Sequence, residues 1–424
     1  MEEEASSRPS KKARGASASG LTDFALRLAK RLADGGQRQN QNLVFSPVSI
    51  YAALSLVAAG AHGTTLDELL AVLGAASREE LAESARGVAE RALADRSGSG
   101  SGAPLVAFAC GLWHEKTVAL KPDYRAAATE SYKAKTRAAD FKNKPEKARK
   151  RINRWVSKAT NDLITSILPR GSVHSLTGLV IANAIYFKGR WSMPFNETDT
   201  ETRLFNLLDG STVDAPFMSC RTDHAVALHK GFKVLKMAYH PYQIPHWEDA
   251  YLHRNKQKDS DDGSDQPRFS MCVFLPKARD GLPELVEKMA SRPSFVWDHL
   301  PKERSKTRVW LPKFKLSFSS QMNGVLKAMG MEAAFDETKA NFSDMLELEG
   351  DQPLVVEHVF HKAVIEVDEE GTIAAASTAC TMRLVCATIP VNFVADHPFA
   401  FFVVEEVSST VVFMGHVLDP TRSE

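Results

Sequence analysis

The sequence has few cysteines and almost no net charge. Five cysteines stand among 424 residues, and no two of them have the C-x-x-C spacing of a zinc or redox motif; they are Cys110, Cys220, Cys272, Cys380 and Cys386. We therefore expect reduced thiols and neither a disulfide framework nor a structural zinc site. The formal net charge is +1. Because nucleic acids and anionic membrane surfaces attract proteins with a basic excess, we expect neither of them as a partner.

Long apolar runs are also lacking. No run approaches the roughly 20 residues that span a bilayer, and the first residues, "MEEEASSRPSKKARGASASG", lack the apolar core of a signal peptide. Their low hydrophobicity predicts a disordered tail over residues 1–20. We expect a cytoplasmic protein, and "KKAR" is a candidate nuclear address whose four residues are more often simply solvated.

The motifs of common enzymes are missing as well. The sequence contains no G-x-S-x-G elbow, no phosphate-binding glycine loop and no H-E-x-x-H, so we do not expect an enzyme. His240, His246 and His253 share one polar, loop-like segment, but they lack tight ligand spacing. We therefore predict neither a metal nor a cofactor.

The patterns that are present mix helices and strands without regular alternation. Helical periods occur at residues 21–33, 45–60 and 64–74, and "GLVIANAIYFKGRW" (Gly178–Trp191) reads as a strand buried on both faces. Further apolar strands follow in the second half, which together predict an α+β fold. A basic amphipathic helix is expected near residues 144–164. Five basic residues between Lys147 and Arg154 favour a solvated face over a polyanion site.

One stretch fits neither element. From Gly371 to Val391 the only charge is Arg383, and small residues dominate "GTIAAASTACTMRLVC". Alanine-rich sequence has high helix propensity, so a surface helix is one interpretation. Glycine and the threonines weaken it, and structureless connections longer than about 12–15 residues usually carry function.

Four segments resemble the serpin family, and their sequences resemble those of plant serpins most. They are "NLVFSPVSIYAALSLVAAGAHGTT", "IANAIYFKGRW", "HKAVIEVDEEGT" and "NFVADHPFAFFVVEEVSSTVVFMGHV". The resemblance runs from Leu21 to Pro420 in the family's order. It implies one domain over residues 21–424, with three β-sheets, about nine helices and an exposed reactive-centre loop at about 371–391. A surface insertion is expected at about 241–266, where the chain is longer than ordinary loops.

The resemblance implies a protease inhibitor that acts as a suicide substrate. A protease cleaves the loop and becomes acylated, and the loop then inserts into a sheet as a new strand. The implied hinge comprises Glu369, Glu370, Gly371, Thr372, Ile373, Ala374, Ala375, Ala376 and Ser377. If the loop inserts as a strand, successive residues point to opposite faces. The face that starts at Thr372 then carries no charge, whereas Ile373 and Arg383 lie on the opposite face. Ile373 departs from the acidic residue of inhibitory relatives, and we expect it to be tolerated there.

The scissile bond is set by family spacing from Gly371. That spacing places it between Val385 and Cys386, and a small β-branched residue before the bond suits an elastase-like protease. The alternative bond lies between Arg383 and Leu384, where a protease that reads arginine would cut. The later bond leaves a longer strand to insert and is favoured.

Four further residues, together with Glu369 of the hinge, match family motifs. Ser49 in "SPVSI", Asn183 in "IANAI" and His361 in "FHKAV" resemble a polar cluster beneath the opening sheet. Trp191 and Glu369 resemble the site where insertion begins. Without these motifs, each would be interpreted as an ordinary buried residue.

The expected partner is a serine or cysteine protease, bound covalently by a monomeric inhibitor. The alternative is a non-inhibitory serpin that serves as a carrier or binding module and whose loop is cleaved without trapping.

Overall fold

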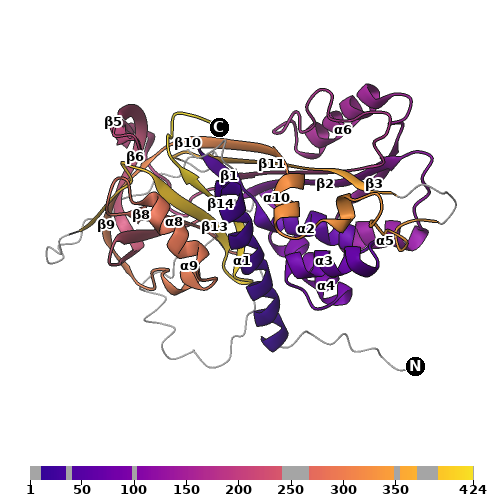
Figure 1. Ribbon diagram of the computed structural model, residues 1–424. Helices are drawn as coiled ribbons and strands as arrows, with labels where there is room; N and C mark the ends of the chain where they lie inside the picture. Colours follow the sequence, from indigo (N-terminus) through magenta and orange to yellow (C-terminus); the bar gives the residue numbers. More distant parts are fainter. Residues whose placement is uncertain are drawn as a thin grey trace, which may run out of the picture.

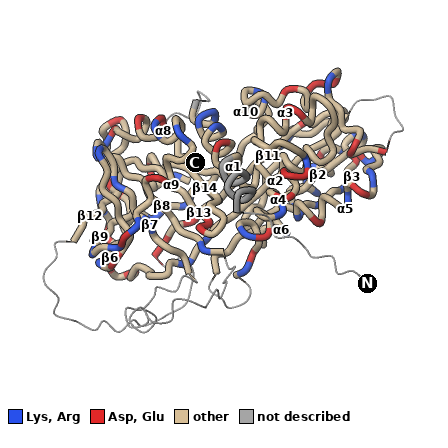
Figure 2. Tube along the Cα trace, turned by 90° about the horizontal axis from the view of Figure 1, so that it is seen from below, with Lys and Arg blue, Asp and Glu red and all other residues tan. Residues whose placement is uncertain are grey.

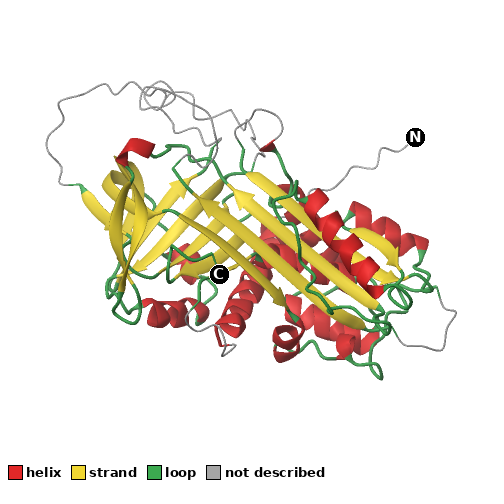
Figure 3. Ribbon diagram, turned by 90° about the horizontal axis from the view of Figure 1, so that it is seen from above, coloured by secondary structure: helices red, strands yellow, loops and turns green. Residues whose placement is uncertain are grey.

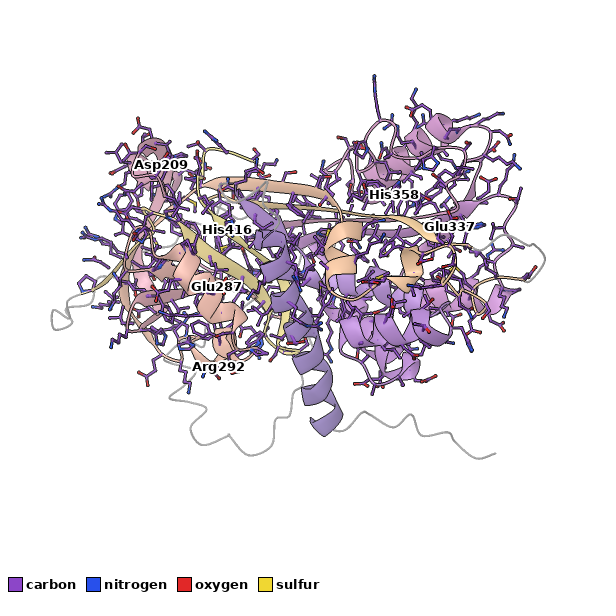
Figure 4. All side chains as sticks on the ribbon, in the orientation of Figure 1. Asp209, Glu287, Arg292, Glu337, His358 and His416 are labelled. Atoms are coloured by element: carbon purple, nitrogen blue, oxygen red, sulfur yellow. The ribbon has the colours of Figure 1, made fainter. Side chains whose placement is uncertain are left out.

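The computed structural model describes residues 11–34, 41–97, 103–240, 267–347, 354–369 and 390–423. These residues form nine α-helices and fourteen strands, which confirms the α+β prediction (Figure 3). The strands belong to two hydrogen-bonded sheets that lie end to end along the molecule (Figure 1). Asp209, in the turn after strand β5 (Glu201–Asn206), lies near one end of the molecule, and Glu337 lies towards the other (Figure 4).

The first sheet has five strands with β4 at its centre. Their order is β10 (Phe314–Gln321), β11 (Val356–Val367), β4 (Leu179–Lys188), β2 (Leu105–Glu115) and β3 (Lys135–Ala139). All but the last residue of β4 are buried, as its uninterrupted apolar sequence predicts. Strands β11 and β4 are parallel neighbours, whereas each has an antiparallel neighbour on its other side.

Helices cover both faces of the five-stranded sheet. α2 (Pro47–Ala58) packs against β4 and β2, and every one of its residues is buried. Ser46 caps its first turn and Pro47 begins it, as a Ser-Pro start predicts. α6 (Pro145–Ala159) lies on the opposite face (Figure 1). Around α2 stand α3 (Gly63–Leu73), α4 (Arg78–Arg91), α5 (Pro122–Glu130), α10 (Asn323–Ala328) and the 3-10 turn η4 (Ala333–Phe335).

The second sheet has nine strands. In order they are β1 (Leu43–Phe45), β14 (Thr410–Val417), β13 (Phe399–Glu405), β8 (Phe269–Pro276), β7 (Phe232–Ala238), β6 (Thr212–Leu228), β9 (Arg304–Pro312) and β12 (Val391–Val394), and β5 pairs with β6. The expected second and third sheets are joined here because the long strand β6 pairs with β7 at one end and with β5 and β9 along the rest. α8 (Leu282–Ala290), α9 (Phe295–Asp298) and the 3-10 turn η2 (Glu197–Asp199) complete this half.

The N-terminal helix begins earlier than expected. α1 runs over Lys11–Asp34, so residues 11–20 belong to a helix rather than to the predicted tail. Lysine, alanine and arginine are good helix formers, and no proline interrupts this segment. The predicted insertion and most of the predicted loop lie outside the described residues. Within the described residues, no helix is both long enough and apolar enough to cross a membrane.

Candidate functional site

A buried polar cluster lies midway along the boundary between the parallel strands β11 and β4, which we call the joint. His361 and Asn183 lie directly opposite each other in the register of the two parallel strands. His361 Nδ1 is 2.8 Å from Asn183 Oδ1, and Ser49 Oγ donates to the same oxygen at 2.9 Å. Asn183 Nδ2 donates to the Ser49 carbonyl at 3.0 Å. We call Ser46, Ser49, Asn183 and His361 the central polar cluster.

The protonation of this cluster follows from its contacts. The Ser46 backbone N–H donates to His361 Nε2 at 3.4 Å, so Nε2 is the acceptor and Nδ1 carries the proton that Asn183 accepts. His361 is completely buried, and burial lowers its pKa to about 3. The imidazole is therefore neutral at physiological pH, and the cluster holds no charge.

The polar row continues into the next strand. Cys110 on β2 lies opposite Asn183 in the antiparallel register and hydrogen-bonds to its side chain. Burial raises the pKa of the Cys110 thiol to about 12, and the bond to Asn183 offsets only part of that rise. Asn183 is thus held by α2, by β2 and by β11, and only its bond to β11 crosses the parallel joint.

The end of β11 is held by a second set of contacts, which we call the strand-end anchor. Trp191 Nε1 donates to the Asp368 carbonyl at 2.8 Å, and the Phe195 N–H donates to the Glu369 carbonyl at 2.9 Å. Glu369 accepts from Thr200 Oγ1 at 2.7 Å and pairs with Lys313 at 2.7 Å. Burial alone would raise the pKa of Glu369, but these two hydrogen bonds lower it below its usual range.

Ion pairs across β4 and β10 complete the anchor. Lys188 Nζ, at the end of β4, lies 2.9 Å from Glu366 and 2.7 Å from Asp368. Lys315 on β10 also pairs with Glu366, at 2.9 Å. Burial opposes the charge on Glu366, but hydrogen bonds from the two lysines outweigh it and lower its pKa to about 2. Burial likewise opposes the charge on Lys188, but its two carboxylate partners raise its pKa above the ordinary value.

Trp191 is fixed by stacking on Tyr239. The two rings lie 4.4 Å apart at 12°, and both are buried. A Cβ on Gly189 would come within 2.3 Å of the Tyr239 ring, so only glycine allows this approach. Tyr239 lies two residues before the predicted 241–266 insertion. It therefore links the start of that insertion to Trp191, which binds the Asp368 carbonyl.

The structure places the five sequence-predicted site residues that it describes in two separate groups. Ser49, Asn183 and His361 share one cluster, and Trp191 and Glu369 share the strand-end anchor. The hinge residues from Glu370 to Ser377 and both candidate scissile bonds, between Arg383 and Cys386, lie outside the described residues.

The predictions about metal and thiols are only partly testable. Among the described residues, no group of three or more His, Cys, Asp or Glu side chains is placed to hold a metal ion. His246 and His253 lie outside those residues. Cys110, Cys220 and Cys272 are free thiols, whereas Cys380 and Cys386 fall outside the described part of the chain.

Sequence reasoning missed the ion pairs and the aromatic stack of the anchor. Lys188 and Glu366 each stand at the end of a buried apolar strand, in "YFKGRW" and "VIEV". A charge at such a position signals a partner on a neighbouring strand, but the partner depends on the strand order. Tyr239 gives no comparable signal, because its contact with Trp191 joins segments that are distant in the chain.

Comparisons with known proteins agree with this architecture. The family model for serpins, described as "serine protease inhibitor", matches residues 19–420. Serpin-Z2A of Oryza sativa subsp. japonica is 56% identical, covering 95% of this chain and 97% of that protein. Serpin-Z2B of the same rice is 55% identical, covering 96% and 98%. The solved structure of Arabidopsis AtSerpin1 in its native stressed conformation has a TM-score of 0.83 at 37% identity, covering 98% of this chain and all of the other.

The five-stranded sheet has a polar cluster between its two parallel strands, and the chain after residue 390 joins the second sheet. This architecture is that of the serpin class of protein. The chain belongs to the serpin family. Members of this family generally inhibit proteases by a suicide-substrate mechanism.

Proposed function

We propose that this chain inhibits a serine or cysteine protease by forming a covalent acyl-enzyme and then inserting residues 371–385 between β11 and β4. The single observation that carries the proposal is the parallel pairing of these two strands directly before the loop. The chain supplies a scissile peptide bond and no catalytic group, so it acts as an inhibitor and not as an enzyme. We further propose that it acts as a monomer.

The strand order supports insertion at this joint. A segment that follows β11 and folds back runs antiparallel to β11, and therefore also antiparallel to β4. Its entry replaces one parallel ladder with two antiparallel ladders, which are slightly more stable per residue. Because neighbouring strands lie about 4.8 Å apart, entry moves Asn183 and His361 to roughly twice that separation and breaks their hydrogen bond.

The covalent step is conventional acyl transfer. The nucleophilic oxygen or sulfur of the protease attacks the carbonyl carbon of Val385, and the base of the protease takes the nucleophile's proton. That proton passes to the amide nitrogen of Cys386, which leaves as a new amino terminus. Insertion of about 15 residues at roughly 3.3 Å each would carry the attached protease on the order of 50 Å before the ester or thioester is hydrolysed.

Incubation with a panel of elastase-like, trypsin-like and papain-like proteases tests the proposal. We expect an SDS-stable complex with at least one of them and a released fragment that begins at Cys386. A fragment that begins at Leu384 would overturn the bond assignment alone. Only cleaved product across the panel would overturn inhibition and favour the carrier alternative.

Two matched substitutions test insertion itself. Thr372→Arg places a charge on the strand face that enters the interior and is expected to convert the inhibitor into a substrate. Ile373→Arg places the same charge on the other face and is expected to retain trapping. Equal trapping by both variants would contradict insertion in this register.

A further inference from the structure

Helix α6 separates its charges by face. Arg149, one of the five basic residues noted in the sequence, turns inward, where it pairs with Glu146 and donates to the Leu168 carbonyl. Successive residues of an α-helix are rotated by about 100° around its axis, and on this basis the exposed cations fall within an arc of roughly 100°. They are Lys147, Lys150, Arg151, Arg154 and Lys158, which we call the basic face of α6. The face extends about 16 Å along the helix, and all five of its cations are exposed, whereas Ile152 and Val156 on the other side of α6 are buried.

Glu146 lies one turn before Lys150 and acts on it electrostatically, but the cations of the basic face form no close ion pairs among the described residues. By contrast, Lys188, Lys236 and Lys315 elsewhere each pair with a glutamate. Over much of the molecule, basic and acidic residues are intermixed (Figure 2). Like charges three or four residues apart destabilise a helix. The stability of α6 therefore does not explain this arrangement.

The adjacent sheet edge adds one more arginine beside the basic face. Arg151 Nη1 donates to the Ala138 carbonyl, which joins α6 to the edge strand β3. Arg137 of β3 and Arg151 lie 6.0 and 5.6 Å from the ring centre of Trp113. Trp113 Nε1 and Arg137 Nε are buried without a hydrogen-bond partner. Arg137 and Arg151 thus meet at one indole beside the basic face, and the two buried N–H groups have no acceptor within the described part of the chain.

We propose that the basic face of α6, with Arg137, binds the phosphodiester backbone of a nucleic acid. A linear row of cations suits a linear polyanion, and sequence-independent binding of this kind needs only phosphates and positive charges. The face contains no apolar side chain, so it lacks the hydrophobic centre of a typical protein interface. The near-zero net charge led to the opposite expectation because it sums the cations of this face with acidic residues elsewhere in the chain. The proposal does not depend on protease inhibition.

Fluorescence anisotropy with a labelled 20-nucleotide single strand tests the proposal on the full chain. We expect a Kd in the micromolar range at 50 mM salt, and log K that falls linearly with log salt. The triple variant K150Q/R154Q/K158Q is expected to weaken binding at least tenfold and to reduce the magnitude of the slope by about 2, since each phosphate contact contributes about 0.7 for single strands.

A matched control removes three exposed lysines from the opposite half of the molecule. K230Q/K277Q/K302Q changes the net charge equally and is expected to leave Kd and slope nearly unchanged. Equal weakening by both triple variants would overturn the proposal, because binding would then follow net charge alone. Binding of dextran sulfate or polyglutamate without binding of the oligonucleotide would overturn it as well.

Lysine acetylation of the wild-type chain gives a readout that needs no variant. With the oligonucleotide bound, mass spectrometry should show at least threefold less modification of Lys147, Lys150 and Lys158, but unchanged modification of Lys230 and Lys277. Equal modification of both groups would overturn the proposal even if the triple variant folded poorly.

Discussion

Two places hold β11 against β4, and they differ in chemistry. The central polar cluster is neutral and buried, and its members are hydrogen-bonded to one another. The strand-end anchor is charged, and except for the buried Glu369 its lysines and carboxylates keep partial contact with solvent. Water can therefore replace the anchor contacts as they break, whereas nothing in the interior can replace those of the cluster.

The difference indicates how the joint opens in our proposal. A strand that enters from the end of β11 first meets the anchor, where the lysines, Glu366 and Asp368 can be hydrated as their pairs separate. It reaches the buried cluster only after part of the new ladder has formed. The cluster should therefore dominate the stability of the closed sheet, and the anchor should tune the ease of the first step.

The largest expected effect comes from Asn183→Ala. The change leaves the His361 N–H without its acceptor in a buried site, which costs about 1–3 kcal/mol, and it also removes the bond of Asn183 to the Ser49 carbonyl, which keeps its helical partner. We expect the free energy of unfolding to fall by about 3 kcal/mol, measured by denaturant titration.

Asn153→Ala is the matched control for that change. Asn153 is also buried, but its hydrogen bonds stay within residues 153–168 and do not cross the joint. Both variants should lose stability, whereas only Asn183→Ala should take up a synthetic 371–385 peptide faster than the wild type. Equal uptake by both would show that the cluster does not control opening.

The second effect is a dependence on pH that separates the two places. His361 has a folded pKa of about 3 against an ordinary 6.5, so below pH 6.5 the unfolded chain takes up a proton that the folded protein cannot. Its contribution is fully present above pH 6.5 and falls by up to about 1.4 kcal/mol per pH unit towards pH 3. His361→Gln should flatten the stability curve between pH 6.5 and 5, and an unchanged slope would contradict a buried neutral imidazole.

Sequence patterns predicted the elements that carry this comparison better than the contacts between them. The apolar run of β4, the Ser-Pro start of α2 and the family motifs around Ser49, Asn183 and His361 were enough to place the central cluster. The ion pairs around Lys188 were not predicted, because they depend on β11 lying between β4 and β10. The early start of α1 was missed because a polar, alanine-rich composition is typical both of exposed helices and of disordered segments.

The third effect concerns the anchor at lower pH. Glu366 has a folded pKa of about 2 against an ordinary 4.5, so its contribution is fully present above pH 4.5 and is lost as the pH falls towards 2. Glu366→Gln removes this dependence and should cost about 1 kcal/mol at pH 7, since Lys188 keeps Asp368 as a partner. Thermal unfolding of both proteins at pH 7 and pH 3 measures it. A wild-type loss between pH 7 and pH 5 that disappears in the Gln variant would contradict the assignment.

The smallest expected effect is that of Lys313→Met, and it bears most directly on how insertion begins. Lys313 is about one-third exposed, so its ion pair with Glu369 is screened by water, and pairs of this kind contribute about 0.5 kcal/mol. Glu369 keeps its bond to Thr200, which limits the loss in the closed sheet. The variant should therefore unfold almost like the wild type, whereas peptide uptake should become faster and less sensitive to salt. If uptake kept its wild-type rate and salt dependence, the anchor would not be the place where the joint first opens.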